Sequence, residues 1–292
     1  MSKTSIEWTQ FSWNPIRGVK GLWHCTHVSE GCRNCYAERM NVRIGGPAYE
    51  PGADTFRLDE KVLQQPLKWR HPRRVFVCSM TDLFHEDVPE EFIDQVFAVM
   101  GVKWGHTFQV LTKRPARMKS YLDNIRRQER WWDAMPGRDS WEKRDRQDEL
   151  TEQFPLPNVW LGVSVEDEKT ACERIPILLQ TPGAVRWISA EPLLTGIDFS
   201  RWLPIAARGN GYEQVKSTAA YGEQKRPGID WLVCGGESGP KARPMHPDWA
   251  RSIRDRCQAA GVPFFMKQMG GRRTHNDIPI PADLAITEYP IK

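Results

Sequence analysis

Short runs rich in β-branched and aromatic residues recur along the chain, each followed by a polar turn and a segment with helical periodicity. The six clearest are Val75–Cys78, Thr107–Thr112, Val159–Val165, Val185–Ser189, Ile229–Cys234 and Val262–Met266, with a weaker seventh around Phe11–Ile16. These runs are apolar on both faces, as parallel strands covered by helices are. Strand–helix alternation of this kind predicts a parallel sheet with right-handed crossovers, either open or closed into a barrel.

Boundary signals mark three of the predicted helices. Asp87 can cap the first, which has Pro89 in its first turn. The second runs from Asp248 to Ala260 and stops at a glycine. The third runs from Asp167 to Gln180, and Pro176 must shorten or kink it.

Two segments interrupt this alternation. Residues from about 125 to 157 are dense in both charges and predict a largely helical insertion, and residues from about 198 to 227 predict a long loop. The sequence has no internal repeat and no clear domain boundary, so we predict a single domain over residues 1–292. The hydrophobic fraction of 40% is enough to bury a sizeable core.

Composition also limits the compartment and the partners. No stretch approaches the roughly 20 apolar residues that a membrane span needs, and residues 1–9 lack the apolar core of a signal peptide. We therefore expect a cytoplasmic protein with no membrane partner. The net charge of +4, from 41 basic and 37 acidic residues, permits an anionic partner such as a nucleic acid without indicating one.

The most specific motif is a group of three cysteines in a polar, loop-like segment. Cys25, Cys32 and Cys35 form a C-x6-C-x2-C pattern, and the chain has seven cysteines in all. An odd number, in a compartment where disulfides are rare, argues against a disulfide framework. The short second gap lets two thiolates bind one metal centre. Three cysteines can hold three corners of an iron–sulfur cubane and leave the fourth iron open.

Three alternatives stand beside the iron–sulfur cluster, which we favour. A structural zinc site would take His24 or His27 as its fourth ligand. Thioredoxin-like redox chemistry would use the pair Cys32 and Cys35 and leave Cys25 without a role. Inert buried thiols are the last alternative, and the polar character of this segment argues against it.

Polar side chains follow the predicted strands, at the positions where ligands gather in a parallel βα-barrel. They are Ser79, Thr81, Asp82, Lys113, Ser164, Glu166, Asp167, Glu191, Glu237, Ser238, Lys267 and Gln268. A carboxylate after a strand often caps the next helix, and capping is an equal alternative for Asp82 and Asp167. A lysine directly after an apolar strand, as at Lys113, indicates a ligand-binding role.

Five segments carry a resemblance to a known family. They are Trp13-Asn14-Pro15, Cys35-Tyr36-Ala37-Glu38 at the end of the cysteine motif, Leu111-Thr112-Lys113-Arg114-Pro115, Gly162-Val163-Ser164-Val165-Glu166 and Gly235-Gly236-Glu237-Ser238-Gly239. Over nearly its whole length the chain resembles a family of phage and bacterial three-cysteine-motif proteins. That family is similar in turn to radical S-adenosylmethionine enzymes, most closely the spore photoproduct lyase-like branch. Their usual motif is C-x3-C-x2-C, so the six-residue first gap here is a departure.

The resemblance implies a partial or near-complete parallel (β/α) barrel with a [4Fe–4S] cluster and S-adenosylmethionine. The implied reaction is reductive cleavage to a 5′-deoxyadenosyl radical that abstracts hydrogen from a substrate, with electrons from a reductase or a flavodoxin-like protein. By the same resemblance Lys113 pairs with the cofactor carboxylate, Ser164 bonds its amino acid or ribose end, and Thr81 and Asp82 line the pocket. The candidate cofactor site also takes in three strand-end carboxylates, Glu166, Glu191 and Glu237.

The substrate implied by the resemblance is a nucleic acid or nucleotide, with Cys78 as a candidate hydrogen donor. A buried small hydrophobe is the alternative for Cys78, because neighbouring strand residues point to opposite faces. One segment has adjoining cations and stacking surfaces that suit a nucleic acid, namely Arg126, Arg127, Arg130, Trp131 and Trp132. The rival function is a non-catalytic nucleic-acid-binding module that carries zinc or a cluster.

Overall fold

The computed structural model describes residues 2–124, 127–135, 154–204, 228–272 and 277–290. Its main sheet has eight strands in the order β1-β2-β5-β6-β7-β8-β9-β10. Seven of them run parallel: β2 (Phe11–Trp13), β5 (Arg74–Val77), β6 (Thr107–Thr112), β7 (Val159–Ser164), β8 (Val185–Ala190), β9 (Trp231–Gly235) and β10 (Phe264–Gln268). The short β1 (Ser2–Lys3) is antiparallel to β2.

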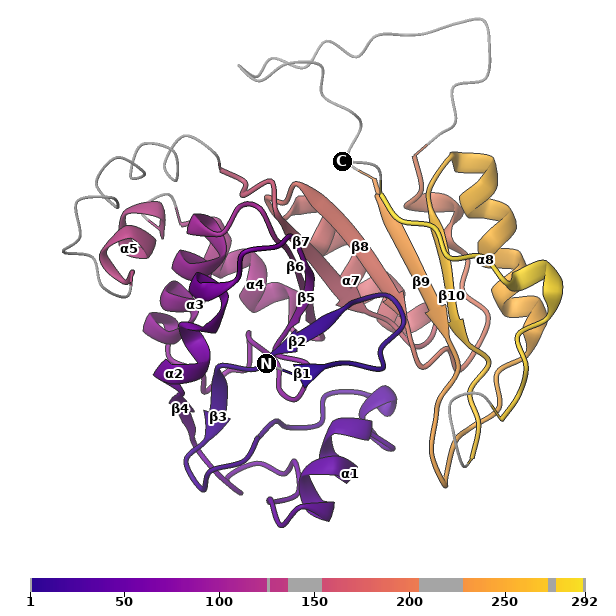
Figure 1. Ribbon diagram of the computed structural model, residues 1–292. Helices are drawn as coiled ribbons and strands as arrows, with labels where there is room; N and C mark the ends of the chain where they lie inside the picture. The colour runs from indigo at the N-terminus through magenta and orange to yellow at the C-terminus, as the bar shows by residue number, and fades with distance from the viewer. Residues whose placement is uncertain (1, 125–126, 136–153, 205–227, 273–276, 291–292) are drawn as a thin grey trace, which may run out of the picture.

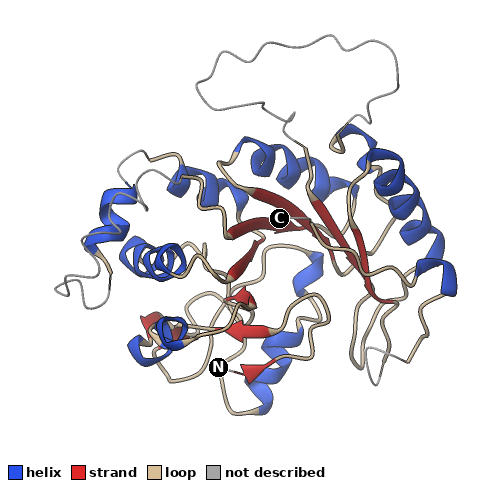
Figure 2. Cartoon of the chain, turned by 45° about the horizontal axis from the view of Figure 1, so that its top comes forward, coloured by secondary structure: helices blue, strands red, loops and turns tan. Residues whose placement is uncertain are grey.

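The seven parallel strands curl into a half-barrel with helices along its outer side (Figures 1 and 2). Each strand coincides with one of the predicted runs, and their spatial order is their order in the sequence. The predicted partial parallel (β/α) barrel is therefore confirmed. Continuous apolar runs identified these strands because both of their faces are covered; all six residues of β7, for example, are buried.

Helices cover the outer face of the sheet and pack on one another there (Figure 1). They are α3 (Glu90–Val102), α4 (Pro115–Leu122), α5 (Arg127–Asp133), α7 (Glu168–Gln180) and α8 (Pro247–Ala260). Short 3-10 helices lie at Glu30–Cys32, Gln65–Lys68, Phe199–Arg201 and Ala282–Leu284. None of the described helices is long and apolar enough to cross a membrane.

Between β2 and β5 the chain forms a small unit that the sequence patterns did not predict. It consists of β3 (Ile16–Gly18), α1 (Tyr36–Arg43), β4 (Phe56–Leu58) and α2 (Glu60–Leu63), with β3 and β4 paired antiparallel. These elements are too short to show a clear period in the sequence. The predicted cysteine motif lies inside this unit, directly before α1.

The third predicted helix, α7, begins where the sequence predicted. The backbone N–H of Thr170 donates to the side chain of Asp167 at 2.8 Å, and the two residues form a capping box. Of the two alternatives for Asp167, capping is therefore confirmed. Pro176 does not shorten the helix, which continues to Gln180.

The other two predicted helix boundaries have opposite outcomes. Gly261 adopts a left-handed conformation with φ of 65° and ends α8, as predicted. The predicted cap at Asp87 is wrong. Its backbone N–H donates to Nδ1 of His85 in a turn, so the chain is not yet helical there, and α3 begins only at Glu90.

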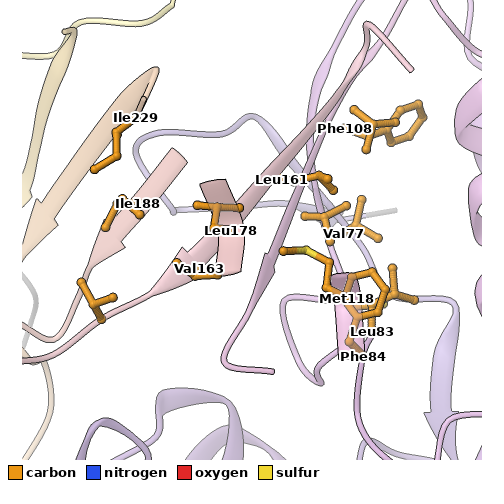
Figure 3. Close-up of a cluster of buried hydrophobic side chains, with 14 of the residues drawn as sticks. Val77, Leu83, Phe84, Phe108, Met118, Leu161, Val163, Leu178, Ile188 and Ile229 are labelled. Atoms are coloured by element: carbon orange, nitrogen blue, oxygen red, sulfur yellow. The ribbon is translucent and has the colours of Figure 1, made fainter. Parts of the chain in front are cut away.

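The larger hydrophobic core lies between the sheet and the helices (Figure 3). It includes Val77, Leu83, Phe84, Phe108, Met118, Leu161, Val163, Leu178, Ile188 and Ile229. Burying a side chain of this size contributes on the order of 1.5–3 kcal/mol, so this layer fixes the sheet and the strand ends that carry the polar residues.

A second, mainly aromatic cluster packs on the opposite face of the sheet. Its aromatic members are Trp8, Phe76, Trp160, Trp187, Trp231 and Phe265, here called the aromatic floor. Side chains alternate along a strand, so Ser164 lies on the same face as Trp160, and Ser189 on the same face as Trp187. The aromatic floor is therefore followed, toward the carboxyl ends of the strands, by a polar rim.

The two predicted insertions fall partly outside the described residues, at 136–153 and 205–227. The first begins with α5, in agreement with its predicted helical character. Trp131 and Trp132 on α5 are buried, and the Trp131 ring stacks on Phe97 with 4.9 Å between centroids. This part of the segment therefore packs into the main core.

Packing between β7 and β8 gives a direct test of the fold. Gly162 pairs with Trp187 on β8, and a Cβ atom at Gly162 would overlap the indole ring. We expect Gly162→Ala to lower the free energy of unfolding by about 1–3 kcal/mol, as overpacking does. Urea denaturation measures the difference. Gly105→Ala is the control because a Cβ there has open space around it, and equal destabilisation by both changes would contradict this packing.

Candidate functional site

A cavity of about 210 Å³ lies at the carboxyl ends of the parallel strands, with Trp8 and Phe76 among its walls. The three motif cysteines, Cys25, Cys32 and Cys35, also line it. Nine of the predicted strand-end residues also line it, namely Ser79, Thr81, Asp82, Lys113, Ser164, Glu191, Glu237, Ser238 and Lys267. The structure thus brings together, around one space, most of the candidate residues that the sequence places more than 200 positions apart.

The segment His24–Cys35, here called the cysteine loop, is tied to the loops after four different strands. Ser29 Oγ donates to Glu166 Oε1 after β7 at 3.0 Å, and Asn34 Nδ2 donates to Glu237 Oε2 after β9 at 2.9 Å. Further bonds join the loop and the first residue of α1 to the segments after β5 and β6, through Thr81, Ser79 and Arg114. These contacts hold the three thiols at the carboxyl ends of the strands.

Burial raises the pKa of two thiols of the cysteine loop, and nearby positive or partly positive groups oppose that shift. Burial, assisted by the charge of Asp82, raises the pKa of Cys25 to about 12, while the guanidinium of Arg114 opposes the shift from 4.0 Å away. Burial also raises the pKa of Cys35, the N-cap residue of α1, and the backbone N–H groups at the start of that helix oppose the shift. A cation and a helix N-terminus both favour a sulfur that carries negative charge, but burial outweighs them, so the pKa of both thiols is raised.

The side chains of this loop limit which metal groups it could hold. Within the described residues, no three His, Cys, Asp or Glu side chains are grouped so as to hold one metal ion. The candidate zinc ligand His27 bonds Glu38 instead, at 2.8 Å, and His24 is buried against the ring of Phe56. Cysteines of a cubane ligate different irons, so a cubane does not require the three thiols to meet at one ion.

Lys113 and Ser164, predicted to share a cofactor site, are in direct contact. Lys113 Nζ donates to Ser164 Oγ at 2.6 Å and also forms an ion pair with Glu166. Both Lys113 and Ser164 line the cavity, whereas Glu166 is fully buried behind them. Lys113, predicted to bind a ligand, is thus open to the cavity. Glu166 does not line the cavity, so nothing in its position supports the prediction that it contacts a cofactor.

Glu166 instead holds three parts of the site together. Besides Lys113 it accepts hydrogen bonds from Arg174 on α7, at 3.2 Å, and from Ser29 of the cysteine loop. Burial would raise the pKa of Glu166, but Lys113 and Arg174 hold it below its ordinary value, so the carboxylate stays charged. A Cβ atom at Gly31 would overlap the side chain of Glu166, so only glycine lets the cysteine loop lie this close to it.

Asp82 and Arg114 form a second buried network beside Cys25. The Asp82 carboxylate accepts from Thr112 Oγ1 at 2.8 Å, from the Lys113 backbone N–H at 3.1 Å and from Arg114 Nη1 at 3.2 Å. Asp82 therefore fixes the end of β6 against the turn after β5, and helix capping does not account for it. Arg114 was not among the predicted site residues, although it directly follows Lys113 in the sequence.

The remaining predicted carboxylates already have partners within the protein. Glu237 accepts hydrogen bonds from Asn34 and from the backbone and side chain of Arg243, and these bonds outweigh burial and lower its pKa. Glu191 forms an ion pair with Lys267 on the cavity wall. Sequence patterns gave no signal for Asn34 or Arg243. Asn34 lies 203 residues from its partner Glu237, and Arg243 is joined to Glu237 across an irregular turn.

Cys78, the candidate hydrogen donor, is buried at the cavity wall. Its φ of 56° lies in the left-handed region, which few residues other than glycine adopt. The unusual backbone follows the end of β5, where the Cys78 N–H still donates to the carbonyl of Trp13 at 2.9 Å. Burial raises the pKa of the Cys78 thiol, so it keeps its proton.

The predicted nucleic-acid surface on α5 is not supported by the side chains described there. Trp131 and Trp132 are buried, and Trp131 Nε1 donates to Tyr121 at 2.7 Å, so neither ring offers a stacking surface. Arg130 forms ion pairs with Glu90 and Asp94. The other two predicted cations, Arg126 and Arg127, have side chains outside the described part of the chain.

The buried carboxylate of Glu166 predicts a pH-dependent loss of stability in Glu166→Gln. Breaking a buried ion-pair network costs about 3 kcal/mol at pH 7. Because the folded pKa of Glu166 is lowered, its contribution is complete above the unfolded value of about 4.3 and is lost as the pH falls through the folded value. Urea denaturation across a pH series should show the difference from the unsubstituted protein shrinking below about pH 4.3.

The matched control for this change is Glu168→Gln. The Glu168 side chain is 41% exposed and pairs with Arg201, so its loss should cost less than about 1 kcal/mol. A Glu166→Gln variant as stable as Glu168→Gln at pH 7 would contradict the network described here.

Comparisons with known proteins add the family of the chain. No curated protein and no solved structure matches the sequence. One family model, described as "protein of unknown function (DUF5131)", matches residues 3–284, which is nearly the whole chain. The chain therefore belongs to the DUF5131 family.

Proposed function

We propose that this protein is an iron–sulfur enzyme of the radical S-adenosylmethionine type, with Cys25, Cys32 and Cys35 as the cluster ligands. One observation carries the proposal: the three thiols and the Lys113–Ser164 pair line the same cavity at the carboxyl ends of parallel strands. When bound, a [4Fe–4S] cluster and S-adenosylmethionine supply reductive cleavage to a 5′-deoxyadenosyl radical that abstracts hydrogen from the substrate.

In this proposal the residues of the cavity wall bind and orient the cofactor. The Lys113 ammonium donates to the carboxylate of S-adenosylmethionine while Glu166 keeps it in place from behind. Ser164 bonds the amino acid or ribose end, and Thr81 lies on the wall nearest the cysteine loop. Asp82 and Glu237, whose oxygens already have protein partners, act by fixing the walls.

The shape of the cavity suits chemistry that must avoid water. Trp8 and Phe76 of the aromatic floor line the cavity, and the cysteine loop crosses the carboxyl ends of the strands. Apolar and aromatic walls exclude water from a reactive species and protect it from side reactions. Glu191 and Lys267 form an ion pair on the cavity wall, and both are polar groups that can orient a substrate.

The proposal includes a cytoplasmic location and an electron donor of the reductase or flavodoxin type. A nucleic acid or nucleotide as substrate now rests on the resemblance alone, because the two tryptophans that favoured it are buried. Cys78 remains the candidate hydrogen donor, supported by its place at the cavity wall and its protonated thiol.

Metal content tests the proposed ligands. Protein reconstituted anaerobically with iron and sulfide should carry about four irons per chain. Alanine at Cys25, Cys32 and Cys35 together should remove them, because no other thiol replaces these three. Cys172→Ala and Cys257→Ala are the controls and should keep the iron, since Cys172 is exposed on α7 and Cys257 is buried in α8. Zinc in a colourless native protein would contradict the proposal.

Calorimetry tests the proposed role of Lys113. A charge-assisted hydrogen bond to the cofactor carboxylate is worth roughly 1.5–3 kcal/mol, so Lys113→Ala should weaken binding of S-adenosylmethionine about ten- to a hundredfold. The iron content should not change. Lys169→Ala, an exposed lysine on α7, is the matched control. Equal affinities of the two variants would rule out this role.

A further inference from the structure

Exposed apolar side chains concentrate around the cysteine loop. Eight large hydrophobic residues are exposed in the described part of the chain: Val19, Val28, Tyr36, Met40, Val42, Ile44, Trp104 and Ile278. The first six all lie between residues 19 and 44. Three of them form a stripe on α1 and its C-cap at a spacing of four, with 39, 55 and 57% of Tyr36, Met40 and Ile44 exposed. We call these three residues the α1 stripe.

Met40 and Ile44 of the α1 stripe face solvent, and contacts on the other side of the helix hold them there. Ala37 and Asn41 are the buried residues of α1, and Asn41 Nδ2 donates to the carbonyls of Trp23 and Pro47, both at 2.8 Å. Arg39 also donates to the carbonyl of Ser238 after β9, at 2.8 Å. The helix is thus anchored through its inner face, and its exposed apolar face has no covering within the described residues.

The α1 stripe begins at the candidate cluster site. Tyr36 directly follows Cys35 and lines the same cavity. With a rise of about 1.5 Å per residue, Met40 lies only about 7 Å along the helix from Cys35. A protein bound on this stripe therefore lies next to the thiols of the cysteine loop.

The surroundings of the stripe carry an excess of positive charge. Residues 30–44 and 237–243 contain five cations and three acids, namely Arg33, Arg39, Arg43, Lys241 and Arg243 against Glu30, Glu38 and Glu237, a difference of +2. All three acids are already paired within this chain, Glu30 and Glu237 with Arg243 and Glu38 with His27. An apolar centre with a cationic rim is complementary to a partner with an apolar centre and an acidic rim.

We propose that the α1 stripe is the docking site of an acidic electron-transfer flavoprotein of the flavodoxin type. The inference rests on the proposed function, because that chemistry needs an electron donor close to the cluster ligands. The same charges disfavour a second copy of this chain, whose cationic rim would face an identical cationic rim across a twofold interface.

Titration calorimetry with an oxidised flavodoxin tests this docking site. Oxidised flavodoxin has no electron to give, so the experiment measures binding without any reaction. We expect the iron-loaded protein to bind it at low ionic strength and to lose affinity as salt rises. Met40→Asp and Ile44→Asp should each weaken binding at least about tenfold, because each places a buried charge of the partner's own sign at the interface.

Trp104→Asp is the matched control, because Trp104 is 64% exposed and lies in the turn between α3 and β6. Its affinity for flavodoxin should equal that of the unsubstituted protein. Equal affinity of Met40→Asp and Trp104→Asp, or no binding at low salt by iron-loaded protein, would overturn the docking site while leaving the proposed function intact. A dimer that Met40→Asp dissociates in sedimentation would also overturn it. Protein that takes up no iron would instead contradict the proposed function.

Discussion

The fully buried carboxylate of Glu166 is the contact on which the rest of the candidate site depends. It accepts from Lys113 at the end of β6, from Arg174 on α7 and from Ser29 in the cysteine loop. A buried charge is tolerated only when it is paired and hydrogen-bonded, so the carboxylate draws these three elements to one point. Its pKa stays below the ordinary value in spite of burial, so this attraction persists at neutral pH. Gly31 then lets the cysteine loop lie directly on it.

The same principle repeats around the cavity. Asp82 holds Arg114 beside Cys25, and Glu237 holds Asn34, the neighbour of Cys35 in the sequence, together with Arg243. Carboxylates at the strand ends therefore fix the walls, while Lys113, Ser164 and the three thiols face the space between them. This division matters for the proposed chemistry, because a cofactor is positioned accurately only when the side chains that bind it are held by others.

Sequence reasoning recovered the architecture because parallel strands leave local signals. All seven parallel strands appear as apolar runs, and ligand residues of a parallel sheet must follow strand ends. The roles of Glu166 and Glu237 were not predictable, because their partners Ser29 and Asn34 lie 137 and 203 residues away. Helix α1 was not predicted either. Its exposed positions include Tyr36, Met40 and Val42, so its apolar residues do not mark the buried face.

The central claim is that the cysteine loop and Lys113 serve one bound S-adenosylmethionine. Electron paramagnetic resonance of the reduced, iron-loaded protein tests it most directly, because the signal of a cluster with an open iron changes when a ligand binds that iron. We predict that S-adenosylmethionine changes the spectrum of the unsubstituted protein, and that Lys113→Ala needs a higher concentration for the same change. A cluster spectrum identical with and without S-adenosylmethionine would contradict the account.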